Sequence, residues 1–122
     1  MSEPIDYASI TELNLSNQEL DVLPDLSMYI NLKILDCYNN KITSLDNLPS
    51  SLIELSCDNN NLTSLDNLPS SLKILYCYNN NLTLLDNLPS SLKELSCGCN
   101  PFIYDFKPTL QNIRNYNATR IA

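Results

Sequence analysis

One 14-residue phrase occurs three times at intervals of 20 residues, and this period constrains the fold more than any other feature of the chain. The copies are NNKITSLDNLPSSL at 39–52, NNNLTSLDNLPSSL at 59–72 and NNNLTLLDNLPSSL at 79–92. A unit of this length is too short to bury its own apolar side, so it must stack on its neighbours. The sequence therefore predicts a solenoid whose exposed surface carries the function.

Each unit begins with a segment that alternates like a β-strand. Units starting at Leu32, Leu52, Leu72 and Leu92 follow the pattern LxxLxCxxNxL, and ITELNLSNQEL at 10–20 is an earlier variant. The fourth and sixth residues are predicted to point inward and the third, fifth and seventh outward, as in a short strand of a parallel sheet. The ninth residue is predicted to turn inward and bond to backbone groups, which gives a buried ladder of Asn40, Asn60, Asn80 and Asn100.

The second half of each unit, typified by TSLDNLPSS, is short and rich in Asp, Asn, Pro and Ser. An extended segment or a 3₁₀ turn is expected there rather than a full helix. Its leucines are predicted to reach the core, and they are Leu45, Leu48, Leu65, Leu68, Leu85 and Leu88.

The strand pattern resembles the leucine-rich repeat signature LxxLxLxxNxL, with Cys at the third apolar position. The unit length and the Leu48-Pro49 step are similar to the short repeat class of secreted bacterial effectors and of large DNA viruses. Residues 20–31 of the first unit are similar instead to the class found in phosphatase regulators. The resemblance implies a right-handed solenoid of the α/β solenoid class, mostly strand and 3₁₀ or extended, with a short parallel sheet on its concave face.

The chain of 122 residues is predicted to form one domain. Its expected parts are a lead-in at 1–9, repeats at 10–31, 32–51, 52–71, 72–91 and 92–102 (the last one partial), and a C-terminal cap at 103–122. The cap is expected from the apolar residues that follow the last repeat, namely Phe102, Ile103, Tyr104, Phe106, Leu110, Ile113 and Tyr116. Only nine residues precede Ile10, so the first strand is expected to keep an open edge.

Charge and cysteine content restrict the partners and the compartment. The net charge of −7 disfavours nucleic acid and anionic membranes, and a basic or neutral protein is the expected partner. No signal-like segment and no apolar run long enough to span a bilayer is found. Five cysteines, four of them at one repeat position, are not laid out as a disulfide framework. A cytoplasmic protein is expected, acting in the host cytosol if its source is a pathogen.

Two columns of repeated side chains resemble metal sites. Stacked strands place Cys37, Cys57, Cys77 and Cys97 about 4.8 Å apart in a straight line, which does not match a tetrahedral site, so these cysteines are predicted to be core residues. Cys99 falls outside the inward positions and is predicted to face solvent.

The acidic column consists of Asp46, Asp66 and Asp86, at which calcium would relieve charge repulsion. Turn formation through backbone bonds explains the same residues and is favoured. No metal or cofactor is expected.

Catalysis is not expected, because the chain has no His, a single Gly and no nucleophile with an identifiable base. The predicted function is non-catalytic binding of a protein loop or peptide to the outward face of the strands. The residues predicted to line this face are Ile34, Asp36, Tyr38, Asp58, Ile74, Tyr76 and Tyr78.

Three other interpretations remain open at this point. The first is that the tyrosines have no binding role, because tyrosine is common in β-strands for packing alone. A structural protein that pairs through its N-terminal edge, giving a weak homo-oligomer, is the alternative function. Recent duplication with little selected function is the third.

The assigned register also predicts unequal effects at two neighbouring asparagines. Asn60→Ala is expected to leave buried backbone groups unbonded and to cost about 1 to 3 kcal/mol, whereas Asn59→Ala is expected to cost less than about 0.5 kcal/mol.

Overall fold

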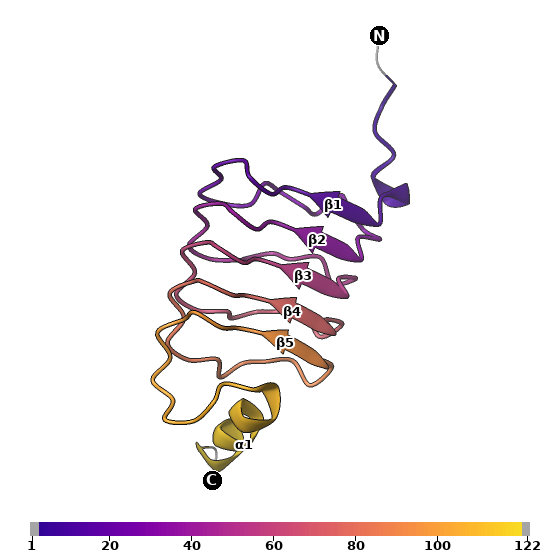
Figure 1. Ribbon diagram of the computed structural model, residues 1–122. Coiled ribbons are helices and arrows are strands. Elements are labelled where there is room, and N and C mark those ends of the chain that lie inside the picture. The colour runs from indigo at the N-terminus through magenta and orange to yellow at the C-terminus, as the bar shows by residue number, and fades with distance from the viewer. Residues whose placement is uncertain (1–2, 121–122) are drawn as a thin grey trace.

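The computed structural model describes residues 3–120 as a parallel β-solenoid with a period of about 20 residues. Each coil contributes one three-residue strand to a single sheet (Figure 1). Strand order along the sheet follows the order along the chain, and neighbouring strands are parallel. The strands are β1 (Glu12–Asn14), β2 (Ile34–Asp36), β3 (Glu54–Ser56), β4 (Ile74–Tyr76) and β5 (Glu94–Ser96). The predicted solenoid class is therefore confirmed.

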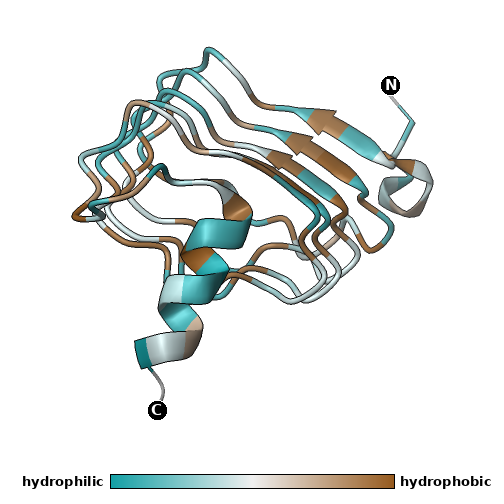
Figure 2. Cartoon of the chain, turned by 60° about the horizontal axis from the view of Figure 1, so that its bottom comes forward, coloured by the Kyte–Doolittle hydropathy of each residue, from teal (hydrophilic) through white to brown (hydrophobic). Residues whose placement is uncertain are grey.

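Equivalent residues of successive coils lie side by side in the sheet. Leu35 pairs with Leu55, which pairs with Leu75, and all three are fully buried. Cys37 and Cys57 are fully buried as well, so the predicted inward positions are confirmed. In the tilted view of Figure 2 the coils overlap, with the strands on one side and the return segments on the other.

The predicted asparagine ladder is present and holds the coils together. Asn60 Nδ2 donates to the carbonyls of Cys37 (3.0 Å) and Cys57 (3.1 Å), which belong to two successive coils. Asn60 Oδ1 accepts from the N–H of Ile42 (3.0 Å). Asn80 makes the equivalent bonds one coil later. These backbone groups lie where the chain bends away from the sheet, so they cannot bond to the backbone of a neighbouring strand. The asparagine side chain supplies the missing partner.

Three asparagines of the ladder are buried, and the last one, at the C-terminal end, is not. The exposed fractions of Asn40, Asn60 and Asn80 are 9%, 6% and 5%. Asn100 is only partly buried, although its Oδ1 accepts from the N–H groups of Asn80 and Leu82 at 3.1 Å. The prediction of a buried side chain is therefore wrong for Asn100, because no further coil stacks upon it.

The return segments contain turns and extended chain, as expected, and no helix between residues 41 and 51, 61 and 71 or 81 and 91. Leu45, Leu65 and Leu85 are buried, and Leu48, Leu68 and Leu88 are partly buried against the same core. A serine hydroxyl joins adjacent coils there: Ser51 Oγ donates to the Leu32 carbonyl at 2.6 Å, and Ser71 and Ser91 repeat the contact. Each return segment is thus bonded to the coil before it.

Asparagine performs a backbone role that glycine commonly has. Eight residues of the described chain other than glycine have a positive φ, and six of them are asparagines. Asparagine tolerates this left-handed conformation better than other side chains, which explains how sharp turns form in a chain with one glycine. Asn59, with a φ of 56°, is one of the six. Alanine would be strained at this position, so a larger loss than the sequence suggested is now expected for Asn59→Ala.

The C-terminal end of the stack is covered by an aromatic cluster and by α1 (Leu110–Arg120), the only α-helix within residues 3–120. Ile113 of this helix is fully buried, and Tyr104 stacks on Phe106 with ring centroids 4.7 Å apart. Arg114 donates to the carbonyls of Pro89, Ser90 and Leu92, which ties the helix to the preceding return segment. Ile103 was expected among the covering residues but is 64% exposed, because the extended chain turns this side chain outward.

The N-terminal end differs, because within residues 3–120 no α-helix lies over the first coil. The lead-in contains a short 3₁₀ helix, η1 (Tyr7–Ser9), whose Tyr7 packs edge-on against Tyr29 with ring centroids 5.0 Å apart. No helix of the described residues is both long and apolar enough to cross a membrane.

Candidate functional site

The residues predicted to form a binding face lie on the outward side of adjacent strands and of the residues that follow them. Pairing places Ile34 beside Glu54 and Ile74 beside Glu94, while Asp36 and Tyr76 flank Ser56. We define the strand face as the outward residues at 12, 14 and 16 of the first coil and their equivalents in the next four coils. The seven predicted residues all belong to this surface, and all but Tyr78 are partly buried.

Tyr78 is the most exposed tyrosine of the strand face, with 43% of its side chain accessible. Its ring lies against Gly98 in the next coil, because a Cβ atom on Gly98 would stand only 3.3 Å from Tyr78 Cδ2. Its backbone N–H donates to Asp58 Oδ1 at 2.7 Å in the preceding coil. Neighbours on both sides thus position this residue. Sequence reasoning missed the role of Gly98, although the only glycine falls at the repeat position of Tyr78.

Every charged side chain on the strand face is a carboxylate. Partial burial, and to a lesser degree the nearby Glu12, raise the pKa of Asp36 above its usual value. Partial burial also raises the pKa of Asp58, while the bond from the Tyr78 N–H acts in the opposite direction. The five acidic residues of the face are Glu12, Asp36, Glu54, Asp58 and Glu94. Three of the five lysines lie beside it, immediately before three of the strands, at Lys33, Lys73 and Lys93. The face therefore favours a cationic ligand.

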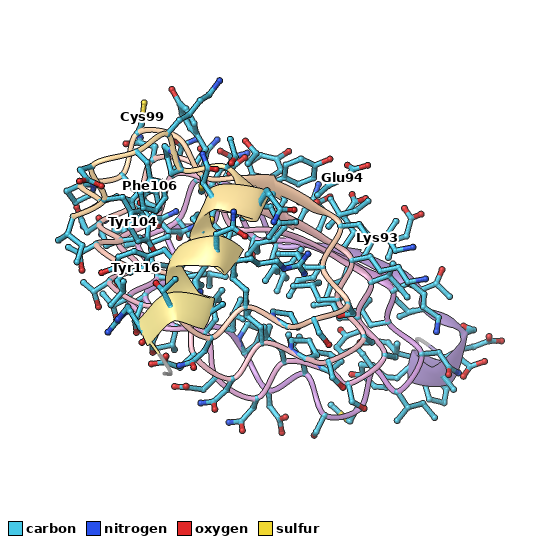
Figure 3. All side chains as sticks on the ribbon, turned by 90° about the horizontal axis from the view of Figure 1, so that it is seen from below. Lys93, Glu94, Cys99, Tyr104, Phe106 and Tyr116 are labelled. Atoms are coloured by element: carbon cyan, nitrogen blue, oxygen red, sulfur yellow. The ribbon has the colours of Figure 1, made fainter. Side chains whose placement is uncertain are left out.

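The four stacked cysteines belong to the core and not to a reactive site. Burial, followed by the charges of Asp36 and Asp58, raises the pKa of Cys37 to about 12. Burial raises the pKa of Cys97 to about 11, and it raises the pKa values of Cys57 and Cys77 well above the usual range for a thiol. Since the thiolate is the reactive form, none of the four is a nucleophile at neutral pH. Cys99 is exposed, as predicted, and its sulfur projects away from the stack (Figure 3).

A thiol titration is expected to separate Cys99 from the other cysteines. In the folded chain one thiol should react quickly with a chromogenic disulfide reagent, and the other four should react at least about 100-fold more slowly, because they are buried and protonated. All five should react quickly in denaturant. The Cys99→Ser variant should show no fast thiol, and a second fast thiol in folded wild-type protein would contradict the structure.

The acidic column of the return segments is a row of separate, exposed carboxylates. Asp46 accepts from Ser44 Oγ at 3.4 Å, and Asp66 accepts from Asn87 Nδ2 at 3.1 Å. Asp86 is also exposed. Within residues 3–120, no group of three or more His, Cys, Asp or Glu side chains could hold a metal ion together.

Two comparisons of the sequence with known proteins give no relative from which a function could be transferred. No protein-family model matches the chain, and no curated protein sequence matches it either.

Proposed function

We propose that this chain is a non-catalytic protein-interaction module of the leucine-rich repeat kind, which binds a basic loop or peptide of another protein on its strand face. The repeat period, the inward Leu and Cys positions and the bonded asparagines support the repeat type. The chemistry of the outward residues supports the ligand.

The observation that carries the proposal is the combination of carboxylates and tyrosines on one surface. Lysine and arginine bind carboxylates through charge-assisted hydrogen bonds and also pack over aromatic ring faces. The strand face offers both partners side by side, because Asp58 lies between Tyr38 and Tyr78 in the column formed by the seventh residue of each unit. Exposed tyrosine adds contact area at low cost in conformational entropy.

The size of the face favours a small ligand. Five strands about 4.8 Å apart give a surface about 20 to 25 Å long, and a width of about 12 Å gives an area of about 300 Å². A standard protein interface buries about 800 Å² on each partner. An extended peptide or a protruding loop therefore fits the strand face better than a flat protein surface does.

The chemistry of the chain favours binding over catalysis and a reducing compartment over an oxidising one. The sequence contains no His, and burial raises the pKa of every core thiol. All five cysteines are free, which is typical of a cytoplasmic protein, in the host cytosol if the source is a pathogen. The excess of acidic residues disfavours nucleic acid and anionic membranes as ligands.

Selection from a displayed library of random peptides tests the proposal. Peptides retained by the wild-type chain should be enriched in Lys and Arg, and they should bind at least about tenfold more weakly to a variant carrying Tyr38→Ala, Tyr76→Ala and Tyr78→Ala. Ile103→Ala is the matched control, because it removes an exposed apolar side chain that lies off the face.

Both variants must elute as folded monomers for the comparison to hold. Selected peptides without basic enrichment, or peptides that bind the triple variant as tightly as the wild type, would contradict the proposal.

A further inference from the structure

The C-terminal end of the solenoid is covered by α1 and aromatic side chains, and the N-terminal end has no comparable cover. Leu13 of β1 remains partly exposed, whereas its equivalents Leu35, Leu55 and Leu75 are fully buried. At the other end, α1 lies across the last coil together with Tyr104, Phe106 and Tyr116 (Figure 3). The lead-in does not substitute for such a cover. Tyr7 packs beside Tyr29, and the chain before η1 rises away from β1 (Figure 1). Core side chains are thus accessible at the N-terminal end of the stack.

Backbone groups are also unpaired at this end. The Thr11 carbonyl accepts from the N–H groups of Lys33 and Ile34, and the Leu15 N–H donates to the Asp36 carbonyl. Alternate residues of a parallel strand bond to opposite neighbours. The N–H and C=O groups of Glu12 and Asn14 therefore point away from β2, toward the side on which the described chain has no strand. Such an edge is a template for another strand.

The charge around the edge indicates which strand it suits. Residues 1–31 contain six of the fourteen acidic residues and none of the seven basic ones. Glu12 is on the edge strand itself, and Glu19 and Asp21 are exposed in the same coil. Two copies paired edge to edge would bring both acidic coils together. Head-to-tail stacking is also disfavoured, because α1 occupies the opposite end of each copy.

We propose that the open edge of β1 binds an extended segment of another protein, in which basic residues alternate with apolar ones, as a sixth strand of the sheet. Backbone groups of the segment pair with Glu12 and Asn14. Its apolar side chains continue the row that begins at Leu13, and its basic side chains lie on the outward side beside Glu12. This surface is the free edge of the sheet. It shares Glu12 and Asn14 with the strand face but none of its tyrosines, so it does not depend on the proposed function.

A synthetic peptide of alternating lysine and valine, seven residues long and blocked at both ends, tests the inference on the full chain. Its binding is measured by fluorescence anisotropy, and hydrogen exchange is followed at the Glu12 and Asn14 amides. One comparison peptide replaces lysine with glutamate, and another carries N-methyl groups on alternate amides. Asn14→Pro is the variant of the edge, because proline is tolerated on an edge strand and removes the donor that points outward, together with the side-chain oxygen that accepts from Ser16.

The lysine peptide should bind and should slow exchange at both amides at least about tenfold. The glutamate peptide, the N-methylated peptide and the Asn14→Pro variant should each show affinity at least about tenfold lower. In the Tyr38, Tyr76 and Tyr78 triple alanine variant, the lysine peptide should still slow exchange at the Glu12 and Asn14 amides, which separates this edge from the tyrosines of the strand face.

Three outcomes would overturn the inference. The first is unchanged exchange at Glu12 and Asn14, and the second is equal affinity for the N-methylated peptide and its parent, a test that holds even if Asn14→Pro fails to fold. The third is a dimer of the chain that forms without peptide and is lost in Asn14→Pro, because it would make a second copy the occupant of the edge.

Discussion

The Ile113→Asp variant is expected to lose at least about 4 kcal/mol of unfolding free energy, because a charge without a partner would replace a fully buried side chain of α1. Ile113 is the only fully buried residue of this helix, which is otherwise held by the bonds that Arg114 and Asn117 donate to carbonyls of the preceding return segment. Its release would expose the last coil, where Leu92 and Cys97 are now covered. Urea denaturation followed by circular dichroism measures the loss.

Thiol reactivity gives a second readout for the same variant. Cys97 Sγ donates to the Pro108 carbonyl, so the segment that leads into α1 shields this thiol directly. Ile113→Asp should therefore make Cys97 reactive in addition to Cys99, while Cys57 stays protected. Asn115→Asp is the matched control, because it adds the same charge at an exposed position of the same helix. Equal stability of the two variants, or an unreactive Cys97 in Ile113→Asp, would show that α1 does not close the stack.

The sequence was sufficient to predict the solenoid because its period fixes which residues stack on which. Once Leu35 and Cys37 are assigned inward, the parallel pairing of five strands and the bonded row of asparagines follow from chain geometry alone. The C-terminal helix was not predicted as a helix. Several asparagines in residues 110–120 weaken helix propensity, and only Ile113 is deeply buried, so the segment lacks the periodic apolar stripe that marks an amphipathic helix.

Details that depend on backbone conformation could not be predicted from the repeat. The phrase NNN does not reveal that Asn59 has a positive φ while Asn60 turns inward. The contact between Tyr78 and Gly98 depends on a ring that leans across to the next coil, which alternation along one strand does not describe. For the strand face, the sequence predicted which residues share a surface, because that follows from alternation. Ligand identity does not follow from alternation and remains a proposal.

The Asn60→Ala variant is expected to lose about 1 to 3 kcal/mol, the range predicted from the sequence. The Asn60 side chain accepts from the buried N–H of Ile42 and donates to the carbonyls of Cys37 and Cys57. Alanine would leave the Ile42 N–H unsatisfied, whereas the two carbonyls would keep the bonds that they accept from Asn40 and Asn80. Asn59→Ala no longer serves as the neutral control, because alanine at a φ of 56° costs about 1 to 2 kcal/mol.

Asn59→Gly is the proper comparison, since glycine adopts this conformation freely and only the exposed bond from Asn79 Nδ2 is lost. Urea denaturation should place Asn59→Gly within about 0.5 kcal/mol of the wild type.

The Asn60→Asp variant tests the same position through the pH dependence of its stability. Burial beside carbonyl oxygens would raise the pKa of the new carboxyl above its unfolded value, so stability should recover as pH falls through the folded pKa. Equal losses in Asn60→Ala and Asn59→Gly, or a loss in Asn60→Asp that does not change with pH, would contradict the inward, backbone-bonded position of Asn60.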